Sequence, residues 1–136
     1  MKQILQNMST GKTDLVECPI PILTMNSLRI STRVSLVSAG TERMLVGFGK
    51  ASYIDKARQQ PEKVRMVLDK ISTDGLATTL DAVKSKLAQP IPLGYSNVGV
   101  IQEINDNTTD LKVGDRVVSN GAHADVVVVK KNLCAR

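Results

Sequence analysis

The sequence predicts a mainly β fold, an antiparallel barrel or sandwich that carries a helical insertion. Short stretches with strand character occupy both ends of the chain and are separated by turns rich in Gly and Asn, which favours antiparallel pairing. Between them, at about residues 50–88, apolar residues recur with helical spacing instead. The length of 136 residues fits one compact domain.

The first third of the chain reads as strands. Gln3–Gln6 and Thr13–Glu17 flank a turn in which Gly11 supplies a positive φ, so we expect a hairpin. Leu28–Leu36 alternates apolar and polar residues over nine positions, as a half-buried strand does.

The insertion contains two apolar stripes with helical spacing. The first follows Pro61, which suits the first turn of a helix, and the second follows the turn Thr73-Asp74-Gly75. The stripe residues are Val64, Val67, Leu68 and Ile71, then Leu76, Leu80, Val83 and Leu87. We therefore expect a pair or trio of helices.

Strands resume after Gly94. We expect them at Val98–Ile104, Arg116–Ser119 and Asp125–Lys130, with a polar turn at 105–109 between the first two. Gly114-Asp115 marks a further reversal of the chain.

Composition argues against several classes of function, and only the pI of 9.4 favours a nucleic-acid binder. Only 2% of the residues are aromatic, which argues against a stacking platform for single-stranded nucleic acid. The net charge is +5, but the Lys and Arg residues are interspersed with acidic residues and form no basic run. We therefore expect no nucleic-acid partner. No leader or membrane-length apolar run is present, and two distant cysteines fit a reducing compartment, so we expect a cytoplasmic protein without a membrane partner.

One polar triplet stands out, because Tyr95-Ser96-Asn97 lies where the chain enters an apolar strand. It belongs to an ordered set of four segments that resembles the N-terminal, GroES-like barrel of the medium-chain dehydrogenase/reductase superfamily, the zinc-type alcohol dehydrogenases and their relatives. The segments are Leu28–Val37 leading into Ser38-Ala39-Gly40-Thr41-Glu42, then Gly94–Val100, Leu111–Val117 and Gly121–Asp125. The third is the most specific, and the set spans nearly the whole chain outside the insertion. The fold expected is thus a GroES-like antiparallel β-barrel.

A narrower resemblance rests on Ser35–Pro61 and on the sequence LGYSNVGV. These resemble a bacterial group in which the barrel and a nucleotide-binding domain are fused to a second oxidoreductase domain of the glucose-fructose oxidoreductase (Gfo/Idh/MocA) type. Such proteins are associated with surface polysaccharide synthesis. The resemblance implies that residues 1–136 are one GroES-like domain of a longer chain.

The residues at the family's zinc positions are not zinc ligands. Ala39 stands where zinc members have a cysteine, and Tyr95 and Ser96 stand where they have the His-Glu of a Gly-His-Glu segment. A catalytic zinc needs three Cys, His or carboxylate ligands, and the four-cysteine cluster of a structural zinc is missing too. We predict no metal.

Two polar residues are candidate catalytic residues. Tyr95 would replace the lost Lewis acid as a proton donor to a carbonyl oxygen, provided that a nearby cation or nicotinamide ring lowers its pKa. Thr41 matches the hydroxyl that relays protons from substrate in the family the chain resembles. We expect the cofactor at Ser38, Ala39 and Gly40, and the substrate at Ser96 and Asn97. The alternatives are that Tyr95 and Asn97 only cap the turn and that Thr41 only bonds to backbone.

His123 is the single histidine, and its segment shapes the barrel in the family; a general base is the alternative. The basic residues of the insertion either bind an anionic sugar nucleotide, pack on a partner, or form an ordinary solvated face.

No strand, glycine-rich turn and helix of a dinucleotide site is found here; Gly47-Phe48-Gly49 is a chance match. We therefore expect NAD or NADP to bind through a downstream nucleotide-binding domain in cis, with a small-molecule substrate, no zinc and a possible homo-oligomer. These residues alone would bind no cofactor and be inactive. We expect the chain to be the substrate-side domain of a zinc-independent oxidoreductase that acts on alcohol, carbonyl or sugar-like substrates. The alternative is a binding or scaffold module that kept the barrel without the chemistry.

Overall fold

A computed structural model of the chain describes residues 1–105 and 110–136. They form two compact units. The first comprises residues 1–5, 14–42 and 92–136, and the second comprises residues 6–13 and 43–91. Of the turn predicted at 105–109, only Asn105 belongs to the described residues.

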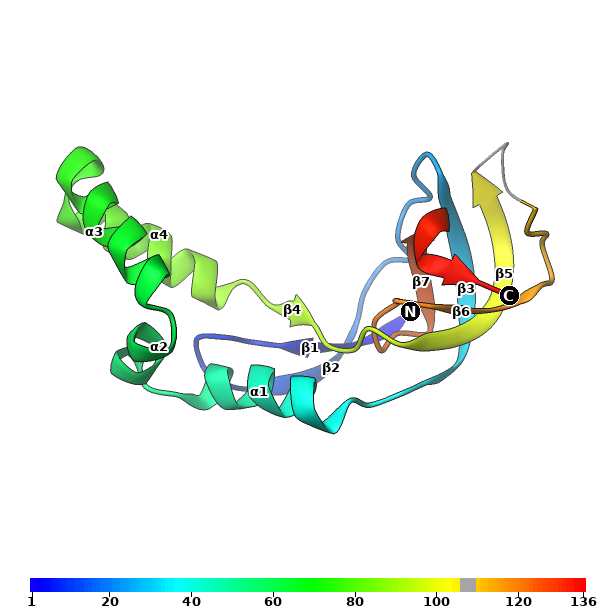
Figure 1. Cartoon of the computed structure of the whole chain (residues 1–136), viewed down its shortest axis with the longest axis horizontal. Helices are drawn as coiled ribbons and strands as arrows, with labels where there is room; N and C mark the ends of the chain where they lie inside the picture. The colour runs from blue at the N-terminus through cyan, green and yellow to red at the C-terminus, as the bar shows by residue number, and fades with distance from the viewer. Residues whose placement is uncertain (106–109) are drawn as a thin grey trace. The chain divides into compact units, whose positions relative to one another are not determined.

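A curled, five-stranded antiparallel sheet makes up most of the first unit, in the order β7-β3-β5-β6-β8 (Figure 1). The strands are β3 (Ser27–Ser35), β5 (Asn97–Asn105), β6 (Arg116–Ser119), β7 (Val126–Lys130) and β8 (Cys134–Ala135), with the 3-10 turn η1 (Lys131–Leu133) before the last. Their locations confirm the predicted strands; the short β8 was not predicted.

A second, three-stranded sheet has the order β2-β1-β4, with β1 (Lys2–Gln6), β2 (Thr13–Glu17) and β4 (Ile91–Pro92). The turn between β1 and β2 contains Gly11 at φ 72°, as the sequence predicts. Because this backbone conformation is strained for residues with a Cβ, glycine is favoured there.

The core of the first unit lies on the five-stranded sheet. It is aliphatic, with Leu28 and Ile30 of β3 fully buried against Ile101 of β5. Leu28 and Ile30 are two residues apart on β3, with the less buried Arg29 between them, which fits the period-2 pattern that predicted this strand. Gly99 of β5 faces β3 so closely that an added Cβ would overlap the carbonyl oxygen of Ser31.

Helices make up most of the second unit. They are α1 (Ala39–Lys50), which starts in the first unit, and α2 (Tyr53–Gln59), α3 (Pro61–Asp74) and α4 (Leu76–Ala88). The last three confirm the predicted insertion. Pro61 begins α3, and Gly75, at φ 86°, separates α3 from α4.

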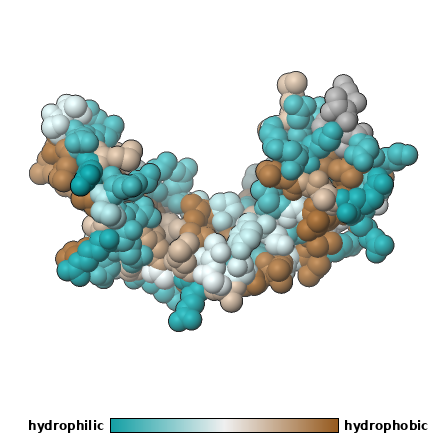
Figure 2. All heavy atoms as spheres, viewed as in Figure 1, coloured by the Kyte–Doolittle hydropathy of each residue, from teal (hydrophilic) through white to brown (hydrophobic). Residues whose placement is uncertain are grey.

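The helices α3 and α4 lie side by side as a helical hairpin (Figure 1). None of the residues of α3 is buried, and Figure 2 shows hydrophobic side chains among hydrophilic ones on the visible surface. In the part of the chain that the structure describes, no helix has the length and apolar character needed to cross a membrane.

Sequence analysis did not predict α1. Three of its twelve residues are glycines, which lower helix propensity and obscure the pattern. A signal was nevertheless present, because Ser38 precedes the helix and the acidic Glu42 lies in its first turn. The backbone N–H of Ser38 donates to the carboxylate of Glu42 over 3.0 Å, which fixes this helix start.

Candidate functional site

Three hydroxyl side chains from two segments meet at the start of α1. The phenol of Tyr95, in the turn before β5, donates to the Thr41 Oγ1 over 3.3 Å. The side chain of Ser38, immediately before α1, lies near enough to the phenol to lower its pKa. We call Ser38, Thr41 and Tyr95 the hydroxyl cluster. The structure thus brings together both candidate catalytic residues and one of the predicted cofactor residues.

The cluster changes the acidity of the phenol. The hydrogen bond with Ser38 and then that with Thr41 lower the pKa of Tyr95 below its ordinary value, and the nearby carboxylate of Glu42 opposes them. A hydroxyl can rotate to donate, so both groups stabilise the phenolate once the proton has left. Tyr95 is 47% exposed, so its proton is accessible from solvent.

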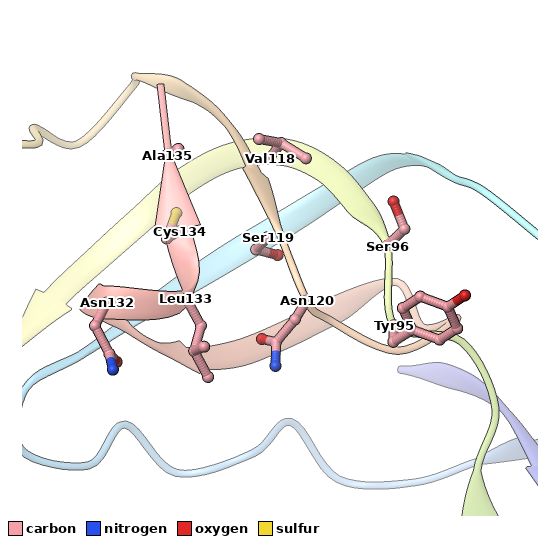
Figure 3. Close-up of a pocket in the computed structure, with 9 residues that line it drawn as sticks. All are labelled: Tyr95, Ser96, Val118, Ser119, Asn120, Asn132, Leu133, Cys134 and Ala135. Carbon is pink, nitrogen blue, oxygen red and sulfur yellow. The ribbon is translucent and has the colours of Figure 1, made fainter.

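Beside Tyr95 lies an open pocket of about 410 Å³ (Figure 3). Its polar lining consists of neutral hydroxyl and amide side chains, namely Tyr95, Ser96, Ser119, Asn120 and Asn132. Figure 3 shows Asn132, Leu133, Asn120 and Tyr95 in a row along one side of it. Val118, Leu133, Cys134 and Ala135 complete the lining, and no charged residue of the described chain is part of it. The pocket therefore combines apolar surface with hydrogen-bonding groups for an uncharged ligand.

The predicted substrate residues have different environments. Ser96 lines the pocket, and its carbonyl oxygen accepts from the Leu36 N–H over 3.0 Å. Asn97 is fully buried, and its Nδ2 donates to the Thr32 Oγ1 over 2.7 Å. Its Oδ1 is buried and has no hydrogen-bond partner among the residues that the structure describes. The structure thus brings Ser96, but not Asn97, to the pocket.

Ala39 and Gly40 form the first turn of α1 and are both exposed. Open space surrounds the position that a Cβ of Gly40 would take. This leaves the backbone of the turn accessible to a ligand, as the predicted cofactor role requires.

The residues present do not form a zinc site. Ala39 has no donor atom, and Tyr95 and Ser96 offer only hydroxyl oxygens to an ion that prefers Cys, His and carboxylate ligands. Within residues 1–105 and 110–136, no group of three or more His, Cys, Asp or Glu could hold a metal ion.

His123 lies in a buried network that the sequence did not reveal. Its Nε2 is 3.0 Å from the Glu42 Oε2, and its Nδ1 is 2.8 Å from the Ser35 Oγ. Both His123 and Glu42 are buried. Sequence analysis predicted a structural role for His123 but did not identify these partners, because 81 residues separate His123 from Glu42 along the chain.

Comparison with solved structures identifies the fold. The chain is similar to the quinone oxidoreductase from Coxiella burnetii, with a TM-score of 0.63 and 16% identity, over 100% of this chain and 36% of that one. It is similar to the galactitol-1-phosphate dehydrogenase from Escherichia coli (TM-score 0.62, 16% identity, 99% of this chain and 37% of that one). It is also similar to the Escherichia coli quinone oxidoreductase complexed with NADPH (TM-score 0.61, 13% identity, 99% and 32%).

The likeness shows that the chain shares the fold of these oxidoreductases, the GroES-like fold that the sequence predicts. The chain spans about a third of the length of these solved structures. No protein-family model and no curated protein matches the sequence.

Proposed function

We propose that this chain is the substrate-side domain of a zinc-independent, NAD(P)-dependent oxidoreductase, a member of the medium-chain dehydrogenase/reductase superfamily. The observation that carries the proposal is the hydroxyl cluster, which has a proton donor where the zinc members of the family have a metal ligand. The fold, shared with oxidoreductases of which one is complexed with NADPH, supports the reaction class.

In this proposal Tyr95 is the general acid for reduction of a carbonyl. Bound NAD(P)H supplies the hydride. Tyr95 gives its proton to the oxygen of the substrate, and Ser38 and Thr41 hydrogen-bond the phenolate that remains. A phenol whose pKa is lowered gives up its proton more readily than an ordinary tyrosine, which suits this role at neutral pH. In the reverse direction the same phenolate accepts the proton of an alcohol.

The pocket favours an uncharged, hydroxyl-rich substrate. Hydroxyl and amide side chains can both donate to and accept from sugar hydroxyls, and the lining has no cation to pair with a phosphate. We therefore propose a sugar-like alcohol or carbonyl, oriented by Ser96 and its neighbours. Asn97 could bind substrate only if its buried side chain became accessible.

We further propose that residues 1–136 are one domain of a longer bacterial, cytoplasmic protein. A nucleotide-binding domain in cis would complete the cofactor site, which Ser38, Ala39 and Gly40 would contact. The resemblance of Ser35–Pro61 to proteins fused to a glucose-fructose oxidoreductase-type domain supports a role in surface polysaccharide synthesis.

Turnover tests the proposal. In the longer chain, NAD(P)H oxidation is followed with a panel of uncharged aldoses, ketoses and quinones. Replacing Tyr95 by Phe removes the acid but keeps the ring, so we expect turnover to fall about 10²-fold or more. Tyr53→Phe, at the other tyrosine of residues 1–136, is the matched control and should leave turnover unchanged.

Unchanged turnover in Tyr95→Phe would remove this phenol from the mechanism. A longer chain that binds neither NADH nor NADPH would support the alternative, a module that keeps the barrel without the chemistry.

A further inference from the structure

The single histidine of the chain connects the two segments that carry the hydroxyl cluster. Its Nε2 lies 3.0 and 3.1 Å from the two carboxylate oxygens of Glu42, in the first turn of α1. Both side chains are buried. A buried carboxylate costs free energy unless it is hydrogen-bonded, so this contact holds Glu42 in place.

Glu42 transmits this constraint to the cluster through the backbone. Its Oε1 accepts from the N–H of Ser38 over 3.0 Å, and its own N–H donates to the Ser38 carbonyl over 3.0 Å. Thr41 accepts a hydrogen bond from the phenol of Tyr95, and the side chain of Ser38 helps to lower the pKa of that phenol. The position of the Glu42 side chain therefore determines where those hydroxyls lie.

The imidazole ring also supports the turn from which Tyr95 projects. Gly94, at φ 88°, precedes Tyr95, and a Cβ at Gly94 would lie 2.7 Å from atoms of the His123 ring. The backbone N–H of His123 donates to the carbonyl of Leu93 over 2.8 Å. The ring thus packs directly beneath the Leu93–Gly94 backbone, while its Nε2 reaches Glu42.

We propose that His123 and Glu42 are positioning residues, which hold the start of α1 and the Gly94-Tyr95 turn at the spacing that lets Thr41 hydrogen-bond the phenol and keeps Ser38 beside it. The role of the cluster in catalysis rests on the proposed function. The positioning itself does not, because it concerns contacts within this chain.

The chemistry of Glu42 defines the role of one ring nitrogen. A carboxylate only accepts, so Nε2 carries a proton and donates to Glu42. The other ring nitrogen, Nδ1, is hydrogen-bonded with the Ser35 hydroxyl over 2.8 Å. Ser35 thereby holds the ring in the orientation that directs Nε2–H at Glu42.

The test is the ionisation of Tyr95, which requires neither cofactor nor substrate. The chain has two tyrosines and no tryptophan, so in a Tyr53→Phe background the tyrosinate absorbance reports Tyr95 alone. In that background His123→Ala should raise the pKa of Tyr95 toward that of a free phenol. His123→Gln, whose amide N–H can still donate to Glu42, should restore part of the lowering.

Two further variants keep the result decisive. Ser35→Ala removes only the partner of Nδ1 and should raise the pKa of Tyr95 by a smaller amount, so it tests the proposal even if His123→Ala fails to fold. Val127→Ala cuts a core side chain of β7 outside the network and should leave the pKa unchanged despite its loss of stability.

An unchanged pKa of Tyr95 in both Ser35→Ala and any folded His123 variant would overturn the proposal. An equal rise of the Tyr95 pKa in Val127→Ala would also overturn it, because the effect would then come from a general loss of packing. So would a His123→Gln variant that restores none of the lowered pKa, because the hydrogen bond to Glu42 would then play no part. Inactivity of the longer chain together with the expected pKa changes would refute the proposed function and leave the positioning intact.

Discussion

The two compact units of the chain place their apolar residues differently. In the first, Leu28, Ile30 and Ile101 are fully or almost fully buried between strands. In the second, α3 has no buried residue, and Leu68, in its apolar stripe, is 59% exposed. A network of fixed side chains such as that of His123 needs packed surroundings, and the first unit has them.

Truncating one apolar residue in each unit should give the largest difference in the free energy of unfolding lost. Ile30→Ala empties a fully buried site of β3, so we expect a loss of about 2–5 kcal/mol in the free energy of unfolding. Leu68→Ala removes mostly exposed atoms of α3, and we expect a change within about 0.5 kcal/mol. Urea denaturation followed by circular dichroism measures both, and equal losses would contradict the contrast.

Adding one methyl group in each unit should change the free energy of unfolding in opposite directions. A Cβ at Gly99 would overlap the Ser31 carbonyl, so Gly99→Ala should destabilise by about 1–3 kcal/mol through overpacking. Gly47 lies within α1 with open space around it, so Gly47→Ala should stabilise by about 0.4–1 kcal/mol. Urea denaturation measures both changes in the free energy of unfolding. A stabilising Gly99→Ala would show that β3 and β5 are less closely packed than the structure describes.

The elements that the sequence predicts are those with local signals. Strands β3 and β5 and helices α3 and α4 have a clear apolar period, and the turns at Gly11 and Gly75 have the residue that their positive φ favours. These are local signals. Helix α1 was missed because its glycines at 40, 47 and 49 hide the period.

The candidate site was predicted only in part. Tyr95, Thr41 and Ser38 were found through the order of four matched segments, and the structure brings them together. The burial of Asn97 and the contact of His123 with Glu42 and Ser35 depend on tertiary packing. Sequence spacing carries no such information, because residue 123 meets residues 35 and 42 only once the sheet has formed.

The acidity of Tyr95 tests the hydroxyl cluster most directly. In the Tyr53→Phe background, alkaline titration of the tyrosinate absorbance should give a pKa below the ordinary value of a phenol, because Ser38 and Thr41 hydrogen-bond the ionised oxygen. Combining Ser38→Ala with Thr41→Val should raise it. An ordinary pKa in the parent, unmoved by that double substitution, would contradict the account.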